Sequence, residues 1–121
     1  MQIDERIVDD VTILDLKGKM TLGEGDELLK DKINSLASQG HKKLVLNLEA
    51  VPYIDSAGLG QLVASYGSVL KAGGALKLLN VGARNQELLS ITRLLTLFES
   101  FDSEAEAVQS YPAVARPAVS G

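Results

Sequence analysis

The hydrophobic pattern changes once between residues 44 and 72, and this change constrains the fold more than any other feature. Residues 44–48, Leu-Val-Leu-Asn-Leu, are almost all apolar, which is typical of a short strand covered on both faces. Apolar residues then recur at three- and four-residue spacing, which predicts an amphipathic helix that ends near Ala72. We expect the buried face of this helix to contain Leu59, Leu62, Val63, Tyr66 and Leu70.

The segments on either side predict an alternation of strands and helices. Two apolar runs, 3–8 and 11–16, predict a hairpin with Val11 and Ile13 on one face and Leu14 and Leu16 on the other. The further expected elements are a helix over 26–38, a strand over 75–79, a helix over 83–92, a short strand at 96–98 and a final helix from Ser103 that ends before Pro112. Strands that alternate with helices require crossover connections, which produce parallel pairing. We therefore expect an α/β fold, a mixed sheet with helices packed mainly on one face.

The composition is typical of one soluble domain. Hydrophobic residues make up 45% of the 121 residues, and the absence of cysteine excludes disulfides, thiol catalysis and cysteine–zinc sites. The net charge of −4 argues against a nucleic-acid partner. No apolar run approaches the roughly 20 residues that span a bilayer, and the N-terminus lacks the pattern of a signal peptide. We expect one domain over residues 1–111, a mobile tail over 112–121, no membrane association and a cytoplasmic location.

Residues that carry catalytic or ligand chemistry are few. His41 is the only histidine, and its position between a glycine and two lysines favours a surface or capping role. The acidic residues between 24 and 31 lack the spacing of a calcium loop. The Gly58-Leu59-Gly60 segment matches neither a dinucleotide fingerprint nor a P-loop. We therefore expect no metal, no cofactor and no enzymatic activity.

Asp55 and Ser56 lie where the central helix is predicted to begin. Either side-chain oxygen can accept hydrogen bonds from the N–H groups that a first helical turn leaves free. A helix start also favours negative charge, so a phosphate on Ser56 is compatible with the helix. Two other interpretations are open: the pair only caps the helix, or Ser56 is the nucleophile of a small hydrolase. The hydrolase lacks the Gly-x-Ser-x-Gly motif and has only His41 as a base.

The segment from Leu46 to Gly60, Leu-Asn-Leu-Glu-Ala-Val-Pro-Tyr-Ile-Asp-Ser-Ala-Gly-Leu-Gly, resembles the signature of the STAS domain. The resemblance is specifically to the bacterial anti-sigma factor antagonists. The strand pair that ends at Gly18, the Gly73-Gly74 turn and the end helix from Ser103 follow the family's order and spacing. The similarity therefore extends over most of the chain.

The resemblance implies a switch by phosphorylation. In this family a partner kinase, which binds ATP and also acts as an anti-sigma factor, phosphorylates the serine after the aspartate, and this position is Ser56 here. Unmodified protein would bind the kinase and free the sigma factor, phosphorylated protein would release the kinase, and a PP2C-type phosphatase would reset the cycle. The resemblance implies a partner surface at Asp55, Ser56, Ala57, Gly58 and Thr21.

The loop after the second predicted strand departs from the family pattern. Many members carry Gly-Glu-Leu/Ile-Asp there, whereas this chain reads Gly18-Lys19-Met20-Thr21. The loss of both acids changes the charge offered to a partner, which affects partner choice. The alternative function is a constitutive STAS adaptor or scaffold in which Ser56 serves only as a helix cap.

Overall fold

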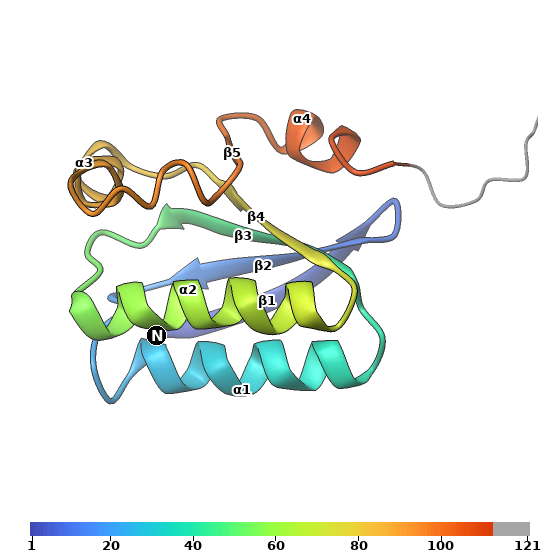
Figure 1. The fold of residues 1–121 in the computed structure, drawn as a ribbon, viewed down its shortest axis with the longest axis horizontal. Coiled ribbons are helices and arrows are strands. Elements are labelled where there is room, and N and C mark those ends of the chain that lie inside the picture. The colour runs from blue at the N-terminus through green and yellow to red at the C-terminus, as the bar shows by residue number, and fades with distance from the viewer. Residues whose placement is uncertain (113–121) are drawn as a thin grey trace, which may run out of the picture.

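Five strands form one mixed sheet in the computed structural model, which describes residues 1–112 (Figure 1). The strands are β1 (Gln2–Val8), β2 (Val11–Lys17), β3 (Lys43–Ala50), β4 (Ala75–Leu79) and β5 (Ser100–Phe101). The helices are α1 (Gly25–Ser38), α2 (Ser56–Lys71), α3 (Ala83–Ile91) and α4 (Glu104–Gln109). Apart from Pro112, the predicted mobile tail lies outside the described residues.

The sheet has the strand order β1-β2-β3-β4-β5. β1 pairs antiparallel with β2, while β2–β3, β3–β4 and β4–β5 are all parallel, as the predicted crossovers require. Because β2 and β3 are parallel, both end at the same edge of the sheet. Figure 1 shows that α2 begins at this edge and that α3 lies at the same end of the molecule. The loops that follow these strands therefore meet there.

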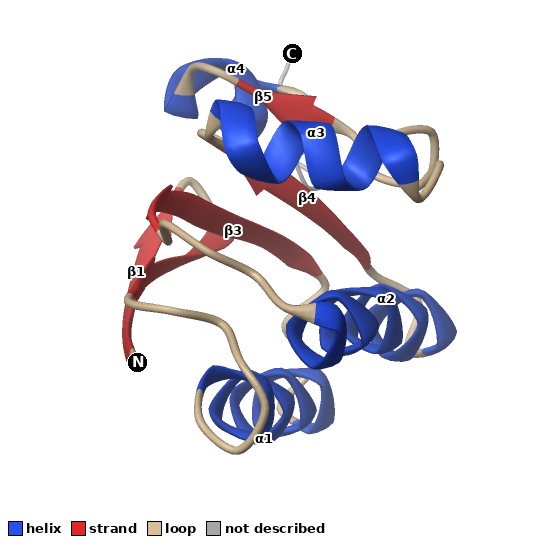
Figure 2. Ribbon diagram, turned by 90° about the vertical axis from the view of Figure 1, so that its left-hand side faces the viewer, coloured by secondary structure: helices blue, strands red, loops and turns tan. Residues whose placement is uncertain are grey.

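Two buried clusters lie on opposite faces of the sheet. The larger contains Leu14 and Leu16 of β2 together with residues of α1, α2 and α3. The smaller contains Val11 and Ile13 of β2 with residues of α4. Figure 2 shows α1 and α2 side by side across one face. The structure thus confirms both the predicted α/β fold and the two faces of the hairpin.

The predicted strand at residues 96–98 is wrong. The last strand is Ser100–Phe101, and the apolar residues before it form turns in which the Leu94 N–H donates to the Leu89 carbonyl at 2.8 Å. Phe98 is 5% exposed and its ring lies edge-on to Tyr66 with a centroid separation of 5.3 Å. The apolar run therefore supplies core contacts from a turn, and hydrophobicity alone does not distinguish the two arrangements.

The predicted buried face of α2 is also partly wrong. The buried residues are Gly58, Leu62, Ser65 and Val69, whereas Leu70 is 55% exposed. The buried face is centred on Leu62 but includes two small residues, one of them polar. Hydrophobic periodicity counts only large apolar side chains. The predicted face therefore followed the leucines and omitted the buried glycine and serine.

Arg6 connects the hairpin to the last helix. Its guanidinium group donates to Asp15 of β2, with 2.6 Å between Nε and Oδ2, and to Glu104 of α4, with 3.0 Å between one terminal nitrogen and Oε2. Asp15 also accepts from the Asn47 side-chain amide at 2.8 Å. Arg6 therefore joins elements that are far apart in the sequence.

These hydrogen bonds from Arg6 predict a dependence of stability on pH. They lower the pKa of Asp15 and of Glu104 in the folded state. A carboxylate with a lowered pKa stabilises the fold above its unfolded pKa and loses this contribution as the pH falls through its folded pKa. We expect the free energy of unfolding, measured by urea denaturation, to fall below about pH 4.

The matched variant is Arg6→Met, which keeps the aliphatic part of the side chain. We expect it to lose about 0.5–1 kcal/mol at pH 7, a value typical of exposed pairs, because the Arg6 side chain is 38% exposed. Its stability should also fall less than that of the wild type between pH 5 and pH 3. Parallel pH profiles for the two proteins would contradict the assignment.

Candidate functional site

The 18–24 loop after β2 and the 51–55 loop after β3 are joined by backbone hydrogen bonds. The Met20 N–H donates to the Tyr53 carbonyl at 3.0 Å, and the Asp55 N–H donates to the Met20 carbonyl at 3.2 Å. Met20 and Ile54 form a parallel bridge outside the named strands. Parallel pairing therefore continues past the ends of β2 and β3 and holds the start of α2 in place.

Asp55 is the N-cap of α2 and uses both carboxylate oxygens. Oδ1 accepts from the Gly58 N–H at 2.8 Å, and Oδ2 accepts from the Leu22 N–H at 3.0 Å. These backbone hydrogen bonds, with that from Gly58 the largest cause, lower the pKa of Asp55. Asp55 therefore carries a negative charge at neutral pH and links the 18–24 loop to the first turn of the helix.

Ser56 is the first residue of α2 and lies at the surface. The interpretation in which Ser56 caps the helix is wrong, because Asp55 makes the capping hydrogen bond. Within residues 1–112 the Ser56 hydroxyl forms no hydrogen bond with another side chain or with the backbone. Its oxygen is therefore free for chemistry with another molecule. Ala57, the next residue, is half-buried.

Gly58 is buried and its position requires the absence of a side chain. A Cβ at this position would lie 2.2 Å from the Met20 carbonyl oxygen and 2.9 Å from the Met20 Cγ. The first turn of α2 therefore packs directly on the backbone of the 18–24 loop. The structure places Gly58 under the surface around Ser56, and its direct contact with a partner stays a prediction.

Thr21 precedes Leu22, whose N–H donates to Asp55 at the surface around Ser56. The Thr21 carbonyl accepts from the Glu24 N–H at 3.2 Å and the Asp26 N–H at 3.4 Å, which shapes the 18–24 loop. The neighbours of Thr21 in the chain, Met20 and Leu22, both bond to Asp55, and a contact of Thr21 with a partner stays a prediction. Sequence reasoning missed Leu22, which is 75% exposed beside the cap. Loops that follow neighbouring parallel strands meet at the same edge of the sheet, and this rule would have indicated that the loop containing Leu22 lies beside Asp55.

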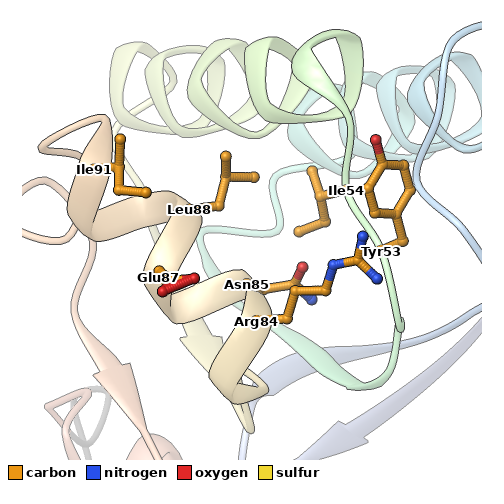
Figure 3. Close-up of a pocket in the computed structure, with 7 residues that line it drawn as sticks. All are labelled: Tyr53, Ile54, Arg84, Asn85, Glu87, Leu88 and Ile91. Carbon is orange, nitrogen blue, oxygen red and sulfur yellow. The ribbon is translucent and has the colours of Figure 1, made fainter.

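A pocket of about 190 Å³ lies between the 51–55 loop and α3 (Figure 3). The Arg84 guanidinium lies 4.8 Å from the centroid of the Tyr53 ring, a cation–π contact between two residues that line the pocket. The lining residues are Tyr53, Ile54, Arg84, Asn85, Glu87, Leu88 and Ile91. No local sequence pattern predicts this pocket, because it forms between segments about thirty residues apart.

Residues 1–112 contain no group of three His, Asp or Glu side chains placed to hold a metal ion. In the same range, no helix combines the length and apolar character that crossing a bilayer demands.

Comparison with known proteins identifies the family. Residues 2–107 match the STAS domain profile. A Thermotoga neapolitana protein named "putative anti-sigma factor antagonist" is 31% identical over 104 residues, which are 86% of this chain and 92% of that protein. The anti-sigma-B factor antagonist of Bacillus subtilis is 40% identical over 72 residues, 60% of this chain and 65% of that protein.

A solved structure agrees with the sequence comparison. The crystal structure of a Thermotoga maritima protein described as a "putative anti-sigma factor antagonist" matches with a TM-score of 0.83 and 28% identity, covering 89% of this chain and 92% of that one. The shared architecture includes the mixed sheet and its helices. The chain therefore belongs to the STAS domain family, and relatives that match it over most of its length are named anti-sigma factor antagonists.

Proposed function

We propose that this protein is an anti-sigma factor antagonist whose binding to its partner is switched by phosphorylation of Ser56. The observation that carries the proposal is the exposed Ser56 hydroxyl at the first residue of α2, which bonds to no other group in the described chain. A kinase needs such an oxygen, because it must bring the γ-phosphate in line with it. The names of the relatives supply the class of partner, an anti-sigma factor.

The proposed reaction takes place in the active site of the partner. The anti-sigma factor is a serine kinase that binds ATP itself. The Ser56 oxygen forms a bond to the γ-phosphorus while the bond between that phosphorus and the bridging oxygen of ADP breaks, and the hydroxyl proton passes to a base of the kinase. The antagonist is therefore the substrate and no enzyme. A PP2C-type phosphatase then hydrolyses the phosphoserine in the cytoplasm and restores the binding form.

Electrostatics support a switch that leaves the fold intact. A phosphate adds about −1.5 to −2 charges beside Asp55, whose lowered pKa already keeps it charged. Within the protein itself, the N-terminus of α2 favours a negative charge, so the phosphate does not destabilise the helix. Backbone hydrogen bonds between the 18–24 and 51–55 loops do not depend on Ser56. The added charge therefore acts mainly on a partner that faces this surface.

Lys19 and Thr21 support a specific choice of partner. Lys19 is exposed in the 18–24 loop, where many family members carry an acid. A positive charge there favours a partner with a carboxylate opposite and disfavours partners matched to an acidic loop. We propose that the two substitutions select the kinase that this protein binds.

A phosphorylation assay with the kinase encoded nearest to this protein's own gene tests the proposal. After incubation with the kinase and ATP, mass spectrometry should find one added phosphate, on the peptide that contains Ser56. The Ser56→Ala variant should bind the kinase and accept no phosphate. Ser68→Ala is the matched control, since Ser68 is an exposed serine further along α2 and its loss should change nothing. Phosphate on another residue, or none, would refute the switch.

A further inference from the structure

The pocket between the 51–55 loop and α3 has apolar walls and one buried polar group. Ile54 and Leu88 form its walls, and Figure 3 shows their side chains with that of Ile91 along one side of the space. The polar group is Asn85 of α3, which is only 2% exposed. A buried amide in such surroundings requires partners for both its nitrogen and its oxygen.

Among the residues that the structure describes, only the nitrogen of Asn85 has a hydrogen-bond partner. Nδ2 donates to the Val51 carbonyl at 2.9 Å, and because a carbonyl can only accept, this hydrogen bond sets the orientation of the amide. The oxygen consequently turns away from Val51, and Figure 3 shows it directed toward Ile54 and Leu88. No group in residues 1–112 donates a hydrogen bond to it. The pocket therefore presents a buried acceptor without a donor.

The size of the pocket indicates what kind of group it accepts. Its volume of about 190 Å³ lies below the roughly 300 Å³ at which pockets for whole small molecules begin. One large side chain fills such a space. Side chains with an apolar body and a hydrogen-bond donor at one end are tyrosine and tryptophan, which are also enriched among the residues that anchor protein interfaces.

The pocket is continuous with the surface around Ser56. Tyr53 and Ile54 line the pocket and directly precede Asp55, the cap of α2. Ile91, at the pocket mouth, is 73% exposed. A protein that covers Ser56 therefore lies next to residues that line the pocket.

We propose that the pocket binds one tyrosine or tryptophan side chain of the anti-sigma factor, whose O–H or N–H donates to Oδ1 of Asn85. The identity of the partner rests on the proposed function, while the chemistry of the occupant rests on the pocket itself. The interface then has two parts: an aromatic anchor at α3, which phosphorylation leaves untouched, and the Ser56 surface, which phosphorylation changes.

A titration with small aromatic probes tests the pocket without the kinase. Indole carries the N–H donor, and 1-methylindole has the same ring without it. In ¹H–¹⁵N NMR spectra of the full chain we expect indole to shift the backbone amides of α3 and the Asn85 side-chain amide, with an affinity about fivefold higher than that of 1-methylindole. Equal affinities, or shifts confined to other segments, would overturn the proposal.

A pair of variants tests the same pocket in the complex. Ile91→Arg places a charge at the pocket mouth. Leu70→Arg places the same charge at an exposed position near the C-terminal end of α2, the end opposite Ser56. We expect Ile91→Arg to weaken kinase binding about tenfold or more and Leu70→Arg to leave it unchanged. Normal binding by Ile91→Arg would contradict the anchor.

The two proposals fail in different ways. If indole binds at α3 but the kinase adds no phosphate to Ser56, the switch is wrong and the pocket stands as a binding site. If Ser56 is phosphorylated and releases the kinase while Ile91→Arg binds normally, the switch stands and the pocket proposal is wrong.

Discussion

Replacement of Gly58 with alanine is expected to lower the free energy of unfolding by about 3 kcal/mol or more. The added Cβ would lie 2.2 Å from the Met20 carbonyl oxygen. That oxygen belongs to the backbone and accepts from the Asp55 N–H at 3.2 Å, so it cannot move away without breaking the contact between the two loops. Urea denaturation at pH 7 measures the loss.

Gly60→Ala is the control in the same helix. A Cβ at Gly60 meets no atom within 4 Å, so the substitution adds only the higher helix propensity of alanine. We expect Gly60→Ala to stabilise the protein by about 0.5–1 kcal/mol. If the two variants change stability by the same amount, the contact between Gly58 and Met20 does not determine how α2 packs.

Replacement of Ser56 with aspartate is expected to weaken binding of the anti-sigma factor about a hundredfold. One added unit charge about 5 Å from a like charge, at an effective dielectric constant of about 20, raises the energy of the complex by about 3 kcal/mol. This energy corresponds to roughly a hundredfold in affinity. Aspartate in the first turn of α2 is favourable for the helix, so the variant should fold normally. Isothermal titration calorimetry measures the affinity, and added salt should reduce the effect.

Two controls separate charge from shape and position. Ser56→Asn has a similar size without charge and should lose much less affinity than Ser56→Asp. Ser68→Asp adds the same charge at an exposed position further along α2 and should bind normally. If Ser56→Asn binds as weakly as Ser56→Asp, the effect is steric. If every variant binds as the wild type does, the protein is a constitutive adaptor.

The hydrolase interpretation makes a separate prediction. A reactive-serine probe would label Ser56 if this residue were an activated nucleophile. Within residues 1–112 the Ser56 hydroxyl has no hydrogen bond to a base, and His41 contacts Thr12, with 3.2 Å between His41 Nδ1 and Thr12 Oγ1. We expect no labelling.

The order of the elements and the position of Ser56 were predictable from the sequence, because both depend on local signals. The change of hydrophobic period after residue 48 separates a buried strand from a helix within a few residues. An aspartate followed by a serine at that change marks a helix start, since only residues nearby in the chain form a cap. Local signals also gave the hairpin, α1 and the final helix to within one or two residues.

Tertiary structure alone decided which of two adjacent residues caps α2, which face of α2 is buried, and that α3 lies against the 51–55 loop. Asp55 caps α2 through the Gly58 N–H, and the Leu22 N–H of the 18–24 loop donates to its second oxygen, which fixes the Asp55 side chain from a distant part of the chain. Gly58 is part of the buried face of α2 because the backbone of Met20 lies against it. The pocket at Asn85 exists only where α3 meets the Tyr53 loop. The contacts of Asp55 with Leu22, of Gly58 with Met20 and of α3 with the Tyr53 loop join residues distant in the chain, and their energies depend on close packing that no local pattern encodes.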